Sequence, residues 1–219
     1  MTRTLTLRDV QSFYDGFGSR QDQQAFYEDA ALEAMIAHAA FEHAGTLFEL
    51  GCGTGRLAER LLMHYLRSDA AYEGVDVSAT MVALARVRLA PFGPRAVVHQ
   101  TGDAVPLPAA SGGVDRIVTT YVLDLMPEET IRTFVDGAAR ALSAEGRLCV
   151  TGITFGNSIL SRLVMLGWRA LYACSPRIVG GCRPLRLARF LSSDSWNILH
   201  HETVVRFGIA SEVIVASPR

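Results

Sequence analysis

The sequence predicts one α/β domain built on a doubly wound, seven-stranded sheet that is mostly parallel and carries helices on both faces. Three observations lead to this fold. Short apolar runs alternate with helix-like segments between residues 46 and 154. Closely spaced glycines at Gly51, Gly53 and Gly55 join the first run to a helix, and acidic residues follow the next two runs. A chain of 219 residues that is 49% hydrophobic is also long enough to bury one substantial core.

The expected strands follow from these apolar runs and from the turn residues between them. They cover 46–50, 72–76, 96–100, 114–121, 147–154, 196–206 and 212–217. The last two are separated only by residues 208–210, which predicts an antiparallel hairpin at one edge of the sheet.

The expected helices occupy the segments with a helical repeat of apolar residues. They cover 7–15, 22–42, 55–66, 78–89 and 128–142. Ser78 is the predicted N-cap of the fourth helix, and the sequence Pro106-Leu107-Pro108 interrupts the chain after the third strand.

The glycine turn predicts a binding site for a nucleotide-like cofactor. Glycines let the backbone come close to a ligand, and the helix that follows directs unpaired N–H groups at it. Asp76, after the second strand, suits a ribose diol because an ionised carboxylate accepts hydrogen bonds from both hydroxyls. A pyrophosphate-binding loop would read G-x-G-x-x-G, whereas here the third glycine comes one residue earlier and Glu49 precedes the turn. A carboxylate at that place repels phosphate and favours a cation such as the sulfonium of S-adenosylmethionine.

Four motifs, spread in order over residues 45–155, resemble those of class I S-adenosylmethionine-dependent methyltransferases, loosely those of quinone biosynthesis. They are Glu49–Gly55, Gly74–Ser78, Gly102–Ala104 and Leu142–Gly146. The resemblance implies a Rossmann-like fold and the cofactor S-adenosyl-L-methionine, with S-adenosyl-L-homocysteine as product.

The same resemblance implies a set of cofactor-binding residues. The glycine loop faces the methionine part, the acid after the second strand binds the ribose, and the acid after the third strand receives the adenine amino group. The implied cofactor residues are Glu49, Gly51, Cys52, Gly53, Gly55, Asp76, Val77, Asp103 and Ala104. Structural alternatives remain open: a helix cap for Asp76, a turn residue for Asp103, and a buried salt bridge with Arg56 for Glu49.

Candidate catalytic residues follow the fourth strand. Methyl transfer is an in-line displacement, so alignment and exclusion of water come first, and a base assists an oxygen or acidic-carbon acceptor. Asp124 is the candidate base and Tyr121 the candidate for orienting the acceptor or sulfonium. Their alternatives are a helix cap or structural hydrogen bond, and simple packing.

The organisation predicted for the chain is a single methyltransferase domain over 1–219. Residues 1–44 form a helical cover, in which Tyr14 or Gln21 contacts the methionine carboxylate or the acceptor, or else an ordinary helix pair. Residues 45–154 are the cofactor-binding core, and 194–219 are the C-terminal strand pair. Between these lies an insertion at 155–193 that shapes the acceptor pocket.

The insertion is basic and apolar. Residues 146–193 contain seven arginines and no acidic residue, although the whole chain has a net charge of −1. Internal ion pairs, an anionic or lipid-soluble acceptor and a transient contact with a membrane surface are the explanations that this pattern leaves open.

Other function classes are disfavoured. The four cysteines lack metal-ligand spacing, which predicts reduced thiols and no metal site. No aromatic and basic interleaving indicates nucleic acid binding, and no signal peptide or run of 18 apolar residues is present, which predicts a cytoplasmic protein of undetermined oligomeric state. A small-molecule methyltransferase is therefore the expected function. A noncatalytic S-adenosylmethionine-binding regulatory protein and, less favoured, a nicotinamide-dependent oxidoreductase are the alternatives.

Overall fold

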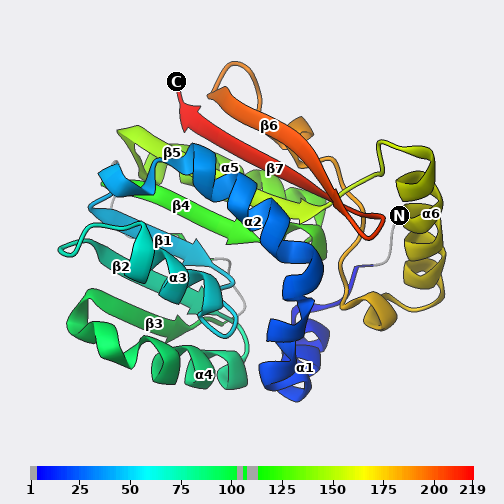
Figure 1. Ribbon diagram of the computed structural model, residues 1–219, viewed down its shortest axis with the longest axis horizontal. Coiled ribbons are helices and arrows are strands. Elements are labelled where there is room, and N and C mark those ends of the chain that lie inside the picture. The colour runs from blue at the N-terminus through cyan, green and yellow to red at the C-terminus, as the bar shows by residue number, and fades with distance from the viewer. Residues whose placement is uncertain (1–3, 103–105, 108–112) are drawn as a thin grey trace.

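The computed structural model describes residues 4–102, 106–107 and 113–219 and contains one seven-stranded sheet (Figure 1). The strand order is β3-β2-β1-β4-β5-β7-β6. The strands are β1 (Thr46–Leu50), β2 (Ala71–Asp76), β3 (Ala96–Gln100), β4 (Val114–Thr120), β5 (Leu142–Ile153), β6 (Trp196–Arg206) and β7 (Ile209–Pro218). Strands β1 to β5 are parallel, and β7 is antiparallel to both β5 and β6. The predicted fold class is confirmed.

The turn of the C-terminal hairpin is shorter than the sequence predicts. Its turn consists of Phe207 and Gly208, with φ of 50° and 81°, and β7 already begins at Ile209. Two successive residues with positive φ are typical of the two-residue turns whose twist matches that of a β-hairpin. The predicted connection over residues 208–210 was therefore wrong. The fifth strand also begins earlier than expected, at Leu142.

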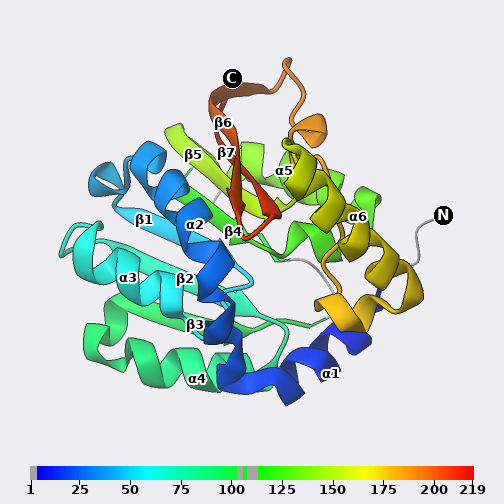
Figure 2. The ribbon, with the colours of Figure 1, turned by 45° about the vertical axis from the view of Figure 1, so that its right-hand side comes forward.

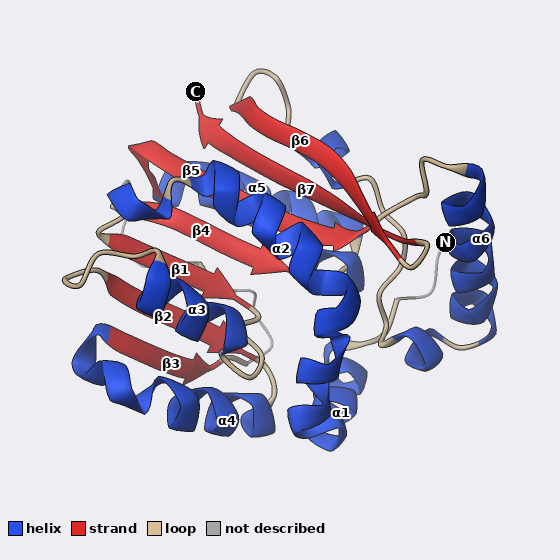
Figure 3. Ribbon diagram, in the orientation of Figure 1, coloured by secondary structure: helices blue, strands red, loops and turns tan. Residues whose placement is uncertain are grey.

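Helices cover both faces of the sheet, as Figure 3 shows. The α-helices are α1 (Leu7–Phe17), α2 (Ala25–Ala39), α3 (Arg56–His64), α4 (Ala79–Leu89), α5 (Glu128–Ala141) and α6 (Ile159–Cys174). One core cluster joins α2, α3 and α4 to side chains such as Leu47 and Val118, and a second joins α5 to their strand neighbours such as Phe48 and Ile117. Because successive strand residues face opposite sides, both faces of each central strand are buried.

Short 3-10 segments replace part of the expected helix at the N-terminus. The predicted helix 22–42 begins with η1 (Gly18–Gln24), continues as α2 and is followed by η2 (Phe41–His43). The other 3-10 segments are η3 (Ala90–Arg95), η4 (Leu123–Leu125), η5 (Pro176–Val179) and η6 (Leu187–Phe190). Ser78 caps α4 as predicted, its hydroxyl oxygen accepting a hydrogen bond from the Met81 N–H at 3.1 Å.

Helices α1 and α6 lie beyond the carboxyl ends of the parallel strands (Figure 1). Open α/β sheets bind ligands at this end, so both helices are placed to enclose a site. In the described part of the chain, no helix is long and apolar enough to cross a membrane.

Candidate functional site

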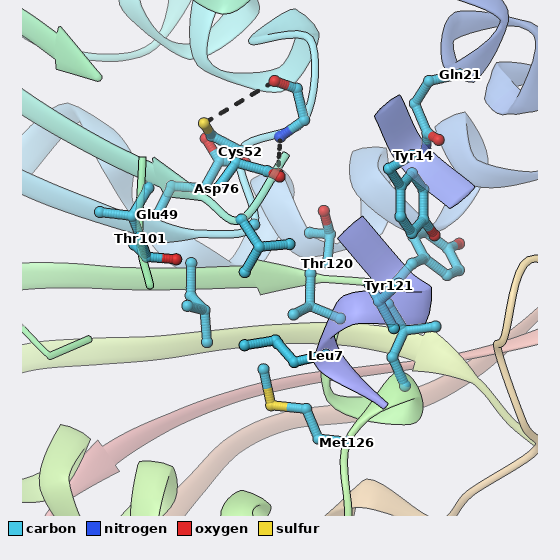
Figure 4. Close-up of a pocket in the computed structure, with 18 of the residues that line it drawn as sticks. Leu7, Tyr14, Gln21, Glu49, Cys52, Asp76, Thr101, Thr120, Tyr121 and Met126 are labelled. Atoms are coloured by element: carbon cyan, nitrogen blue, oxygen red, sulfur yellow. Dashed lines mark hydrogen bonds between the residues drawn. The ribbon is translucent and has the colours of Figure 1, made fainter. Parts of the chain in front are cut away.

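A cavity of about 470 Å³ lies where the loops after β1, β2 and β4 meet α1 and η1. Figure 4 shows Glu49, Cys52 and Asp76 on one side of it and Tyr14, Gln21 and Tyr121 on the other, with Leu7 and Met126 toward a third. Its volume is within the range of small-molecule sites. The cavity therefore brings the predicted cofactor residues and the N-terminal cover to one place.

The glycine loop is held against β2 by its backbone. The N–H groups of Gly51 and Cys52 both donate to the Val75 carbonyl, at 2.8 and 3.1 Å. All three glycines have positive φ, and a Cβ on Gly51 would lie 2.2 Å from Val122 Cγ2. A Cβ on Gly53, which lines the cavity, would meet nothing within 4 Å, so open space lies above the middle of the loop.

Asp76 fastens this loop and also lines the cavity. One carboxylate oxygen accepts from the Gly53 N–H and the other from the Ser78 N–H, both at 2.9 Å. Burial raises the pKa of Asp76, although these hydrogen bonds act to lower it. Each oxygen retains a second lone pair, so the helix-cap role and ribose binding are compatible in this geometry. Val77, the next residue, lines the cavity as well.

Glu49 is buried, with 1% of its surface exposed, and lines the cavity. Its carboxylate accepts from the Tyr72 hydroxyl at 2.6 Å, and burial raises its pKa to about 7. Gly74 makes this possible, because a Cβ there would lie 2.3 Å from the Tyr72 hydroxyl oxygen. The alternative salt bridge with Arg56 is wrong, since that arginine pairs with acids of α2 instead.

Cys52 lines the cavity as a protonated thiol. Burial raises the pKa of Cys52 well above its usual value, with the Glu49 and Asp76 carboxylates adding to the shift. A thiol that resists ionisation is a poor nucleophile, so its contribution is contact and shape.

The N-terminal cover is tied to the glycine loop by charge. Asp22 accepts hydrogen bonds from the Thr54 hydroxyl and from Arg88, each at 2.6 Å, and the Ser78 hydroxyl donates to Asp15 of α1 at 2.5 Å. Tyr14 lies in the cavity wall with its hydroxyl 3.5 Å from the Gly180 carbonyl oxygen. The cover therefore contacts both the cofactor loop and the insertion.

Two side chains of the cover present unpaired oxygen atoms. Gln21 Oε1 and Glu28 Oε1 are buried without a hydrogen-bond partner in the described part of the chain, and both residues line the cavity. Burial raises the pKa of Glu28 to about 7 against the attraction of Arg56. Unpaired buried oxygens are costly, so a ligand with donor groups fits this wall. Glu28 was not predicted from the sequence, since it is one of three acids in α2, with Asp29 and Glu33, and nothing local distinguishes it.

Tyr121 is strained and points into the site. Its φ of 56° is unusual for a bulky residue, and such conformations occur where a side chain must be aimed. It lines the cavity, its hydroxyl lies 2.9 Å from the Ser211 hydroxyl, and its ring packs edge-on against Tyr27. The acceptor-orienting role of Tyr121 stays a prediction.

Asp124 lies elsewhere than the base prediction required. It is fully buried, does not line the cavity, and one carboxylate oxygen accepts from the Ile153 N–H at 3.0 Å. Burial raises its pKa to about 6, with that hydrogen bond acting in the opposite direction. This carboxylate oxygen is thus hydrogen-bonded to β5. The predicted alternative, a structural hydrogen bond, describes Asp124 better than a base role.

The remaining predictions concern Asp103, Ala104 and metal ions. Asp103 and Ala104 lie outside the described residues, while Thr101 and Gly102 before them line the cavity. His38, His200 and Glu202 bring ligand atoms within 4.8 Å of one another. The two imidazole rings, however, stack 3.6 Å apart at 11°, so their lone pairs run side by side instead of converging on one ion. The absence of a metal site stays a prediction.

Comparisons with known proteins agree with this architecture. Residues 47–146 match a family model described as a methyltransferase domain. No curated protein sequence matches the chain. The fold is similar to the [4+2]-cyclase SpnF, with a TM-score of 0.71 and 17% identity over 98% of this chain and 97% of that one.

Two further solved structures share the fold. One is geranyl diphosphate C-methyltransferase from Streptomyces coelicolor A3(2) in complex with Mg²⁺, geranyl diphosphate and S-adenosyl-L-homocysteine, with a TM-score of 0.65 and 13% identity over 88% and 79% of the two chains. The other is a putative methyltransferase in complex with the Trm112 activator of Haloferax volcanii, with a TM-score of 0.67 and 13% identity over 95% and 96%. The match over residues 47–146 and the shared fold agree with the resemblance inferred from the four motifs.

Proposed function

We propose that the protein, whose residues 47–146 match a methyltransferase domain, transfers a methyl group from S-adenosylmethionine to a small, largely apolar molecule. The shared fold alone does not support this activity, because the similar structure of SpnF is that of a cyclase. The proposal rests on the residues of the cavity.

One observation carries the proposal: the cavity has a polar end and an apolar end in a single space. Glu49 and Asp76 supply carboxylates suited to a cation and a diol, and Gly53 leaves open space beside them. The opposite wall contains Leu7, Val10, Leu125 and Met126, which suit an apolar acceptor. A site that joins these two chemistries fits a bisubstrate reaction.

S-adenosylmethionine, when bound, supplies an electrophilic methyl group on a positively charged sulfur. The Glu49 carboxylate would attract that charge, and Asp76 would accept hydrogen bonds from the ribose hydroxyls. Gln21 and Glu28 would satisfy their unpaired oxygens with donor groups of the ligand. Tyr14 and Tyr121 would orient the acceptor, while α1 and η1 exclude water.

Among the described residues that line the apolar end, none is an ionised base. This favours an acceptor atom that is nucleophilic without deprotonation, or one that the Glu28 carboxylate reaches, since its pKa of about 7 suits proton transfer. Neighbours of the same fold include geranyl diphosphate methyltransferases, and geranyl diphosphate joins an apolar hydrocarbon chain to an anionic diphosphate. The assignment of individual residues is part of this proposal.

The experiment is a calorimetric titration of the ligand-free protein with S-adenosylmethionine, S-adenosylhomocysteine and NAD. We expect the first two to bind and NAD not to bind, because Glu49 repels a pyrophosphate. Asp76→Ala should weaken S-adenosylmethionine binding by about 1 to 3 kcal/mol through lost charged hydrogen bonds, whereas the exposed Asp69→Ala should leave it unchanged. NAD binding alone would move the protein to the oxidoreductases.

Catalysis is tested separately from binding. Apolar acceptors are incubated with S-adenosylmethionine carrying a labelled methyl group, and transfer of the label is measured. Binding without transfer to any acceptor class would favour the noncatalytic regulatory alternative. Formation of an unmethylated, rearranged product would place the protein with the cyclases of this fold.

The contact between residues 155–193 and a membrane surface stays a proposal. Ile159, Leu160, Leu163 and Leu166 of α6 are exposed to between 60% and 80%, which is unusual for a helix of a monomeric protein. Figure 1 shows this helix standing apart from the sheet. An exposed apolar helix with arginines and no acids suits an anionic lipid surface.

A further inference from the structure

A second cavity, of about 850 Å³, adjoins the first. It lies between the start of the chain and the segment formed by α6 and η5, which Figure 2 places next to α1. Thr4, Leu5 and Thr6 line both cavities, so this short extended segment is their common wall. The first cavity holds about 470 Å³, which leaves limited room for an acceptor beside a cofactor.

The walls of the second cavity carry excess positive charge. Arg169, Arg177 and Arg183 line it, and Arg186 lies over the ring of Phe155, which also lines it. The guanidinium groups of Arg169 and Arg186 lie over the same Phe155 ring, 5.9 and 5.7 Å from its centre. Two like charges on one ring repel each other, which makes the position favourable for an anion.

The carboxylates of this cavity are already engaged. Asp9 pairs with Arg177 at 2.6 Å, and Glu128 pairs with Arg189. Buried Arg183 donates to the Met126 carbonyl oxygen at 2.5 Å, and its charge acts to lower the pKa of Asp124 against the burial that raises it. In the described part of the chain no ion pair neutralises Arg169, which lines the cavity, or Arg186, which lies over the Phe155 ring of its wall. These two guanidinium groups are therefore available to a ligand.

We propose that the second cavity binds the phosphate or diphosphate end of the methyl acceptor, whose apolar remainder passes along Thr4–Thr6 into the first cavity. Planar guanidinium groups bind phosphate oxygens through paired N–H donors, and two of them suit a doubly charged group better than a single carboxylate. Tyr172 and Leu185 line the same space and offer apolar surface to the part of the acceptor next to the anion. The identification of the ligand as the methyl acceptor rests on the proposed function. The anion site itself does not depend on it.

The test uses inorganic diphosphate as probe and the full-length protein. Calorimetry measures its binding to the unmodified protein, to the double variant Arg169→Gln/Arg186→Gln, and to the control Arg162→Gln/Arg206→Gln. All four arginines are exposed, so both variants remove the same charge. Arg169 lines the second cavity and Arg186 lies over its Phe155 ring, whereas the control pair lines neither cavity. Thermal unfolding of each variant verifies that the fold is kept.

We expect saturable binding of one diphosphate, weakened about tenfold or more by Arg169→Gln/Arg186→Gln and about twofold or less by the control. Absence of saturable binding, or equal weakening by both variants, would overturn the inference. S-adenosylmethionine is titrated into the same samples and should bind both variants normally. Its failure to bind, with diphosphate binding retained, would remove the proposed function and leave the anion site.

A phosphate group can belong to a soluble ester or to a lipid. Vesicles of phosphatidylcholine with and without phosphatidic acid separate these sources. Retention on the phosphatidic acid vesicles that is lost in Arg169→Gln/Arg186→Gln would indicate a lipid head group. Diphosphate binding without retention on vesicles would indicate a soluble ester, and absence of both would overturn the site.

Discussion

The surroundings of Glu49 disfavour the negatively charged form of its side chain. Its carboxylate is buried, receives one hydrogen bond from Tyr72, and lies near Asp76, whose charge raises its pKa further. Burial leaves it poorly solvated, so a cation entering the cavity would be a favourable partner. The sequence position of this acid and its electrostatic state thus point to the same ligand chemistry.

Cofactor binding is therefore expected to release protons. Glu49 has a pKa of about 7 in the free protein, and a bound cation stabilises the ionised form and lowers that pKa. Below about pH 7 the protein should lose close to one proton on binding S-adenosylmethionine, and its affinity should rise as the pH rises toward 7. Calorimetry in buffers of different ionisation enthalpy measures the release.

Glu49→Gln is the matched variant, because the amide oxygen still accepts the Tyr72 hydrogen bond. It should release fewer protons than the unmodified protein and bind more weakly by about 1 to 3 kcal/mol. Identical proton release in both proteins would show that Glu49 does not face the cation.

Single residues were predicted from sequence where the backbone motif fixes them. The glycine turn and the strand ends place Glu49, Gly53 and Asp76 in the cavity wall, because strand ends of a parallel sheet meet at one edge. Asp124 could not be placed in the same way, since it belongs to a 3-10 turn whose orientation depends on packing against β5. Glu28 escaped prediction because only tertiary contacts bring its helix to the loop.

At the scale of elements, two glycines of the loop after β1 have different roles: one position is required for packing and the other for ligand access. A Cβ added to Gly51 would clash with Val122, whereas one added to Gly53 would meet nothing within 4 Å, yet both glycines have positive φ. The two positions therefore share a backbone requirement and differ in what a side chain would meet.

This difference predicts contrasting effects of two alanine substitutions. Gly51→Ala should destabilise the protein by about 2 to 4 kcal/mol, from backbone strain and the clash with Val122. Gly53→Ala should cost about 1 kcal/mol in stability but reduce S-adenosylmethionine affinity more than tenfold, because the methyl group enters the open space. Urea unfolding and calorimetry measure both effects, and normal cofactor affinity in Gly53→Ala would mean that the ligand lies elsewhere.

The peripheral elements were harder to predict than the sheet. The insertion was identified by its length and charge, whereas the position of η5 depends on tertiary contacts with the N-terminal segment, such as the ion pair of Arg177 with Asp9. The hairpin was predicted, whereas its two-residue turn depends on Phe207 adopting a left-handed conformation. Phenylalanine rarely adopts a positive φ, so the sequence gives no local signal for this conformation at Phe207.

Across the whole molecule, the parallel core and the cover enclose the site from two sides. Asp22 and Asp15 link the cover to the loop and to α4, and the insertion contacts the cover through Tyr14. Sequence order predicted the doubly wound sheet and its antiparallel edge hairpin, because consecutive βα units wind in a restricted way. It could not predict that the cover, the loop and the insertion would supply the walls of adjoining cavities.

The enclosed carboxyl groups give the molecule an unusual dependence of stability on pH. Burial raises the pKa of Glu28 and Glu49 to about 7 and that of Asp124 to about 6, above their usual values of 4.5, 4.5 and 3.8. The folded protein then holds more protons than the unfolded chain between these values. The free energy of unfolding of the ligand-free protein should therefore fall as the pH rises from about 4.5 to 7.

Acids with lowered pKa values act in the opposite sense at lower pH. Burial acts to raise the pKa of Asp22, but hydrogen bonds from Arg88 and Thr54 hold that pKa below its usual value. The contribution of Asp22 to the free energy of unfolding is therefore lost as the pH falls below about 4. Together these groups place the stability maximum on the acid side of neutrality. Urea unfolding at a series of pH values measures the curve.

Two variants assign this slope to the buried carboxyl groups. Asp124→Asn keeps an acceptor for the Ile153 N–H and removes the ionisable group, so it should flatten the decline between about pH 4 and 6 by up to about 3 kcal/mol. Asp69→Asn changes only an exposed ion pair with Arg67 and should leave the slope as it is. An unmodified protein whose stability rises steadily from pH 4.5 to 7 would contradict the prediction. Saturating S-adenosylmethionine should reduce the decline, because a bound cation favours the ionised carboxylates that the empty cavity disfavours.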